Sequence, residues 1–114
     1  MPAARDDFLL RLITQAAAAL RRLRERLGGG TADEVMRDAG TAIGALLGPQ
    51  RELLERLDAT SARSIVGNPD TVRAWSALLV LQADAELLRG QPASSERLRA
   101  RARALFPDVE QTAP

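Results

Sequence analysis

Asp84 is the residue of this sequence whose type and position most suggest chemistry. It lies in the stretch 70–89, DTVRAWSALLVLQADAELLR, which is apolar around most of a helical circumference, so that Asp84 falls among leucine and valine side chains. A buried carboxylate needs a cationic partner or a raised pKa. Asp84 is therefore either an acid or ligand-binding group, or one half of an ion pair with a neighbouring helix, for example with Arg97 or Arg101. We favour the ion pair, because a lone carboxylate is poorly equipped for catalysis.

The composition removes most other catalytic and metal-binding groups. The 114 residues include no cysteine, histidine, lysine or tyrosine, and all sixteen basic residues are arginine. Thiolate nucleophiles, the usual general base, Schiff bases and the commonest metal ligands are therefore excluded. Sixteen arginines against fifteen acids leave a net charge of +1, which favours no particular class of partner. We predict a protein that is not an enzyme and that uses no cofactor or metal.

Acidic residues occur in close pairs at three places: Asp6 and Asp7, Asp33 and Glu34, and Glu52 and Glu55. The first two pairs stand where helices are expected to begin, and negative charge is favourable there. The third pair has the i, i+3 spacing that places two carboxylates on one helical face, where they could hold a cation. A di-iron site is not expected, because no Glu-x-x-His motif accompanies the pair.

Four arginines alternate along the last predicted helix: Arg97, Arg99, Arg101 and Arg103. At about 100° per residue they flank a narrow apolar stripe on both sides and do not form one basic face. One interpretation is a patch that binds phosphates of a nucleic acid. The other is a solvated helix whose arginine stems cover its edges, and we favour it because no aromatic residues are interleaved for stacking on bases.

A second stripe runs along the first predicted helix, outside its main apolar arc. It consists of Leu10, Ala17, Arg21 and Arg24. The stripe is a candidate partner-binding surface, for example the seam of a homodimer. The alternatives are that another helix of the same chain covers it, or that it is simply exposed, since an isolated exposed leucine is ordinary.

Apolar residues recur with helical periodicity throughout, and no strand pattern is present. Helices are predicted over 6–27, 31–47, 50–58, 70–89 and 92–105, with a short helical turn near 60–66. Poor helix formers at 58–61 favour a break between the third helix and that turn. The expected caps are Asp6 or Asp7, a T-x-x-E capping box at 31–34, Thr60 or Ser61, and Asp70.

Two glycines, Gly40 and Gly44, lie one turn apart inside the second predicted helix. Glycine lowers helix stability, so its presence favours a close approach of a neighbouring backbone, for which the 16–19 stretch of the first helix is the candidate. The central helix 70–89 contains the only tryptophan, Trp75, which we interpret as a core anchor. The short loops predict that successive helices pack antiparallel.

Two parts of the sequence resemble tetratricopeptide (TPR) repeats. In the first half, the glycine-rich turn, T-A-D-E-V-M at 31–36 and L-L-G-P at 46–49 resemble the second helix of such a repeat, and the second half resembles a longer part of the motif. Trp75 and Leu78 match the W-x-x-L of that motif, and Ala102 with Pro107 matches its closing A-x4-P. Leu79 and Gln82 replace the glycine and the tyrosine that should follow, and the span is about one turn too long. The resemblance implies an all-α, TPR-like array of about five helices, with antiparallel helical hairpins around the central helix.

The whole chain, over about residues 7–107, is similar to a family of small uncharacterised bacterial proteins with TPR-like folds. The match is carried by F-L-L-R-L-I-T-Q at 8–15, by the second helix ending in Leu-Leu-Gly, and by the leucine-rich helix before the long apolar one. The family resemblance implies no catalytic residues.

We therefore expect a flexible N-terminus at 1–5, one TPR-like domain at 6–107 and a flexible tail at 108–114. No secretory signal or membrane-spanning segment is visible, so we predict a cytoplasmic protein. The leading hypothesis for its function is an interaction or adaptor module that binds an unknown protein or peptide. The alternatives are a homo-oligomeric structural protein that pairs through the first helix and, third, a weak nucleic-acid binder that uses the arginine-rich last helix.

Overall fold

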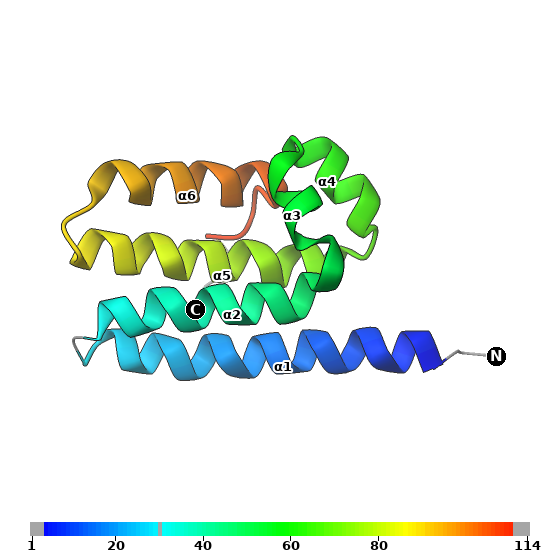
Figure 1. Cartoon of the computed structure of the whole chain (residues 1–114), viewed down its shortest axis with the longest axis horizontal. Helices are drawn as coiled ribbons and strands as arrows, with labels where there is room; N and C mark the ends of the chain where they lie inside the picture. The colour runs from blue at the N-terminus through cyan, green and yellow to red at the C-terminus, as the bar shows by residue number, and fades with distance from the viewer. Residues whose placement is uncertain (1–3, 30, 111–114) are drawn as a thin grey trace.

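Helices account for most of the residues that the structure describes. The computed structural model describes residues 4–29 and 31–110, and within these ranges it contains no strand. Figure 1 shows the helices in their order along the chain. Their bounds are α1 Ala4–Leu27, α2 Ala32–Leu47, the 3₁₀ helix η1 Gly48–Gln50, α3 Arg51–Arg56, α4 Ala59–Val66, α5 Pro69–Leu88 and α6 Pro92–Leu105. The predicted all-α class is confirmed.

Helix α5 lies at the centre of the packing. It contacts α1, α2, α4 and α6, and eleven of its twenty residues are buried. Trp75 and Leu78 belong to the main core cluster, together with Ile43 of α2 and Leu105 of α6. A second cluster joins α1 and α2 to the later turns of α5 through Leu23, Val35, Ala39, Leu81 and Ala85. The neighbours of α5 thus cover its apolar surface on several sides, as its sequence requires.

The segment 50–66 contains two short helices, α3 and α4, and the break between them lies at 57–58, close to the predicted break at 58–61. Leu57 is extended, with ψ at 156°, and ends α3. Asp58 then caps α4 by accepting a hydrogen bond of 3.1 Å from the backbone N–H of Ser61. The predicted cap at Thr60 or Ser61 was therefore wrong, because both residues lie inside the helix. The hydrogen bond from Ser61 lowers the pKa of the Asp58 carboxyl below its ordinary value.

Asn68, not Asp70, caps the central helix. The Asn68 side-chain oxygen accepts hydrogen bonds from the backbone N–H groups of Asp70, at 2.8 Å, and Thr71, at 3.3 Å. Pro69 occupies the first helical position, where the N–H that proline lacks would have no helical partner. Asp70 lies in the first turn, where its charge still suits the helix dipole. The predicted cap at Asp70 was therefore wrong, because Pro69 takes the first helical position and leaves the capping position to the residue before it.

The predicted capping box at 31–34 does not form. The Thr31 side chain bonds to no backbone N–H of α2, and its hydroxyl instead donates to the carbonyl of Arg26 at 3.3 Å. Glu34 pairs with the Arg26 guanidinium, which also contacts Asp38 at 2.8 Å. Arg26, near the end of α1, thus binds the Glu34 carboxylate, which in a capping box would accept from the backbone N–H of Thr31. The acid pair 6–7 also does not cap α1, because that helix begins at Ala4.

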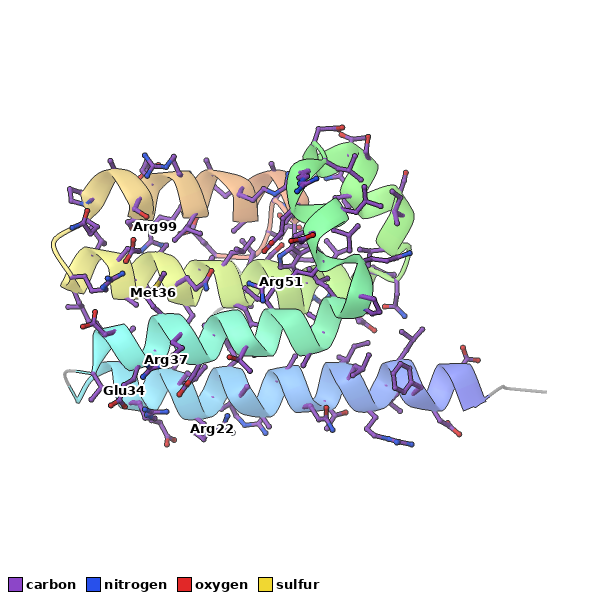
Figure 2. The ribbon with its side chains drawn as sticks, viewed as in Figure 1. Arg22, Glu34, Met36, Arg37, Arg51 and Arg99 are labelled. Carbon is purple, nitrogen blue, oxygen red and sulfur yellow. The ribbon has the colours of Figure 1, made fainter. Side chains whose placement is uncertain are left out.

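The two glycines of α2 make room for an arginine rather than for helix α1. A Cβ atom at Gly44 would lie 2.9 Å from Nη1 of Arg51, and the same nitrogen donates to the carbonyl oxygen of Gly40 at 2.9 Å. Figure 2 shows Arg51 lying against α2. The expected approach of the 16–19 backbone to these glycines was wrong, because the turn after α2 brings the start of α3 onto their side of the helix.

The packed part of the chain continues beyond the boundary expected at Pro107. Val109 is buried in the main core cluster, and Glu110 pairs with Arg99 at 3.0 Å and Arg103 at 3.1 Å. Residues 108–110 therefore lie against α6. The remainder of the predicted tail, 111–114, lies outside the described residues, as do residues 1–3 of the predicted flexible N-terminus.

Among the described residues, no helix combines the length and the apolar character that crossing a membrane requires. The apolar run of α5 is interrupted by polar residues that the core accommodates. Gln82, for example, donates from Nε2 to the carbonyl of Met36 at 3.4 Å.

The cap of α5 provides a test of this fold. Replacing Asn68 with Ala removes the acceptor of two backbone N–H groups, so we expect Asn68→Ala to lower the free energy of unfolding by about 1 kcal/mol. Asp70→Ala should have a smaller effect, because it removes only a favourable charge in the first turn. Urea unfolding followed by circular dichroism measures both. A larger loss at Asp70 than at Asn68 would contradict the assignment of the cap.

Candidate interaction surface

Asp84 lies at the surface edge of α5 and is neutralised there. Its side chain is 43% exposed and pairs with the guanidinium of Arg99, which also contacts Glu110 at 3.0 Å. Figure 2 shows Arg99 on the side of α6 that faces α5. The partner is thus an arginine of the last helix, but neither Arg97 nor Arg101. Asp84 is therefore an ion-pair bridge between α5 and α6.

Three of the four arginines of α6 contact other groups of the same chain. Arg101 donates to the carbonyl of Leu54 at 2.9 Å and lies over the ring of Trp75, and burial lowers its pKa below the ordinary value. Arg103 pairs with Glu110 at 3.1 Å and with Glu96 at 3.4 Å. Within the part of the chain that the structure describes, Arg97 and Arg101 form no ion pair, and of these two only Arg101 is held by a backbone carbonyl and an aromatic ring. The four arginines therefore do not form a free basic face.

Glu86 is the buried carboxylate that the sequence interpretation missed. Only 6% of the residue is exposed. The Ser94 hydroxyl, followed by the Arg89 guanidinium, holds the pKa of Glu86 below its ordinary range. Arg89 also contacts Asp33 of α2 at 2.6 Å. The available signal was the i, i+3 spacing of Glu86 and Arg89 just before the turn at Gly90, which places both beside the start of α6.

The described residues contain no group of three or more His, Cys, Asp or Glu side chains placed to hold a metal ion. Of the acid pair on α3, Glu55 contacts Arg51 at 3.2 Å, and both Glu52 and Glu55 are exposed. Among the described residues, no further His, Cys, Asp or Glu side chain therefore joins Glu52 and Glu55 to form the cation site considered for this pair. The candidate interaction surface lies instead on the outer side of α1, where an exposed stripe meets an apolar groove.

The four residues of the α1 stripe remain largely uncovered. Leu10 is 63% exposed, Arg21 and Arg24 are exposed, and Ala17 is half-buried. Neither arginine of the stripe forms an ion pair with a described residue. The stripe follows one edge of α1, because Leu10, Ala17 and Arg24 are each seven residues apart. Among residues 4–29 and 31–110, no other helix covers this edge at Leu10, which is 63% exposed.

An apolar groove of about 350 Å³ lies beside the stripe, between α1 and α5. Small side chains dominate its surface, and Asp70 and Arg73 are its two charged residues. Ala17 belongs both to the stripe and to this groove, so that the exposed edge of α1 and the groove form one continuous surface. The groove is lined by Ile13, Ala16, Ala17, Leu20, Asp70, Arg73, Ala74 and Ala77.

A second cleft, of about 310 Å³, lies on the other side of α1, against α2. Its lining includes Gln15, Arg22, Asp38 and Thr41, and is more polar than that of the groove. Arg22 is labelled in Figure 2 on the outer edge of α1. Of these two hollows beside α1, the groove on the α5 side is therefore the more apolar.

The N-terminal end of α1 projects from the body of the molecule. In Figure 1 the first turns of α1 extend past the ends of α2 and α5. Phe8, on these turns, is 54% exposed, and Leu10 follows it. Large apolar side chains at such a position contribute nothing to the core of this chain. We define the projecting end as residues 6–10, and the stripe, the groove and the projecting end together as the α1 surface.

No protein-family model, curated protein or solved structure matches the chain. The function therefore has to be inferred from the chain's own geometry.

The buried carboxylate yields a pH-dependent prediction. Because the pKa of Glu86 is lower in the folded than in the unfolded chain, its charge stabilises the fold above the ordinary glutamate pKa of about 4.3. That stabilisation is lost as the pH falls through the folded value. We expect Glu86→Gln to lower the free energy of unfolding by about 1 kcal/mol at pH 7 and by much less at pH 3.

Urea unfolding at the two pH values measures the difference. Glu96→Gln is the matched control, because the Glu96 side chain is 70% exposed and its contact with Arg103 is long, at 3.4 Å. The control should change little at either pH. Equal losses for Glu86→Gln at pH 7 and pH 3 would show that its charge does not stabilise the fold.

Proposed function

We propose that this chain is a non-catalytic protein-interaction module and that the groove between α1 and α5 receives an amphipathic helix. The observation that carries the proposal is the continuity of the alanine-lined groove with the exposed apolar end of α1. Exposed apolar surface of this kind marks interaction sites in proteins. The helical hairpins would then act as a TPR-like scaffold, in which helices position a partner between them.

The shape of the groove supports a helix as the bound element. Two helices, α1 and α5, form its walls, and Ala16, Ala17, Ala74 and Ala77 lie between them. Small residues allow a third helix to approach closely, and its side chains at i, i+3, i+4 and i+7 would meet the groove. Asp70 and Arg73 supply polar contacts at the rim, which would orient the bound helix.

The other functional classes receive less support. The absent residue types argue against an enzyme, and three of the four α6 arginines are engaged within the chain, which argues against a nucleic-acid surface. The cytoplasmic location stays a prediction. Pairing of two copies through α1 is compatible with the interaction module.

Blocking the groove tests the proposal. Ala17→Glu places a charged side chain at the junction of stripe and groove, and we expect it to abolish capture of groove-dependent partners from a native lysate. Ala100→Glu is the matched control, an identical substitution at an exposed helical alanine of α6. Tagged wild-type and variant proteins are compared after their helicity and melting temperature have been shown to agree.

The expected result is at least one captured protein that the wild type and Ala100→Glu retain and that Ala17→Glu loses more than tenfold. If all three proteins capture the same set in the same amounts, the groove is not a binding surface.

A further inference from the structure

The projecting end of α1 and the groove are complementary, and both belong to the same helix. The projecting end carries Leu10, which is 63% exposed and lies on the same edge of α1 as Ala17, whereas Phe8, 54% exposed, leaves the helix about 200° away from it. The groove carries small side chains that leave space, among them Ala17 and Ala74. A surface that presents both a projection and a matching hollow can be satisfied by a second copy of itself.

The charges of α1 show the same complementarity. Asp6 and Asp7 stand in its first turn, and Arg21 and Arg24 stand near its other end. All four are exposed, and none forms an ion pair with a described residue. Two α1 helices that run in opposite directions would place each acidic end beside the partner's basic end, whereas a parallel pair would place like charges together.

We propose that the helix received by the groove is α1 of a second copy of this chain, so that the protein forms an antiparallel, two-fold symmetric dimer. Leu10 of each copy packs on Ala17 of the other, over the junction of stripe and groove. The same register brings Asp6 of one copy beside Arg21 of the other, with Asp7 and Arg24 flanking this pair. This inference rests on the proposed function, since it names the occupant of the same groove.

The interface is narrow. The 24 residues of α1 provide a seam of about 36 Å. The α5 wall of the groove adds to it, but the whole remains near the small end of the range for stable complexes. We therefore expect dissociation in the micromolar range, and we expect added salt to weaken the dimer because charge pairs contribute to it.

Charge exchange tests the pairing directly. Sedimentation velocity over a wide concentration range compares the wild type with two variants, Asp6→Arg/Asp7→Arg and Arg21→Glu/Arg24→Glu. In either variant alone like charges face one another across the seam, so we expect self-association to weaken at least tenfold. In an equimolar mixture both contacts become attractive, and we expect a heterodimer with an affinity within about threefold of the wild type.

A matched pair of leucines checks the apolar contact. Leu10 and Leu88 are both 63% exposed, and Leu88 lies at the far end of α5. Leu10→Asp should abolish the dimer, and Leu88→Asp should leave its affinity unchanged. Circular dichroism spectra and melting temperatures confirm that each variant is folded before its mass is measured.

A wild-type chain that stays monomeric up to several hundred micromolar overturns the dimer, as does a mixture of the two charge variants that fails to associate. The proposed function fails separately, through capture that is insensitive to Ala17→Glu. Monomeric behaviour together with capture that depends on Ala17 leaves the interaction module standing and assigns the groove to a different protein.

Discussion

The structure depends on the burial of α5. A helix that is apolar around most of its circumference is stable in water only when other helices cover it, and here α1, α2, α4 and α6 do so. Trp75, which is almost fully buried, anchors the main core cluster at the centre of this arrangement. The short helices α3 and α4 follow from the same requirement, because the chain must pass from the end of α2 to the start of α5 and then run back along α2.

Arginine ties the covering helices together. Arg51 donates to a carbonyl oxygen of α2, Arg101 to one of α3, and Arg63 to the carbonyl of Ala104 at 2.7 Å, near the end of α6. A guanidinium offers five N–H donors on a long stem, so it can reach a backbone acceptor of a neighbouring helix while its apolar part packs between them. Several arginines of this chain therefore stabilise the packing of its helices. For this reason an arginine-rich helix cannot be identified as a nucleic-acid surface from its composition alone.

The burial of α5 leaves α1 as the least covered of the long helices. It lies on the outside of the packing, with α2 and α5 on one side of it and an exposed edge that carries Leu10 and Arg24. The chemistry of this edge, apolar at one end and basic at the other, has no role in holding the fold together. The proposed interaction with another helix would use both the groove and the projecting turns.

Helical periodicity and the glycine stops allowed the sequence alone to predict the helices, their order, the central position of 70–89 and the break before α4. Periodicity sets the angle at which a side chain leaves its helix, but not which neighbour lies at that angle. Tertiary structure therefore decided that Asp84 meets Arg99, that Gly44 admits Arg51, and that Glu86 is buried beside Ser94. It also decided that Phe8 stays exposed, because α1 is longer than the helices it packs against and its first turns extend past their ends.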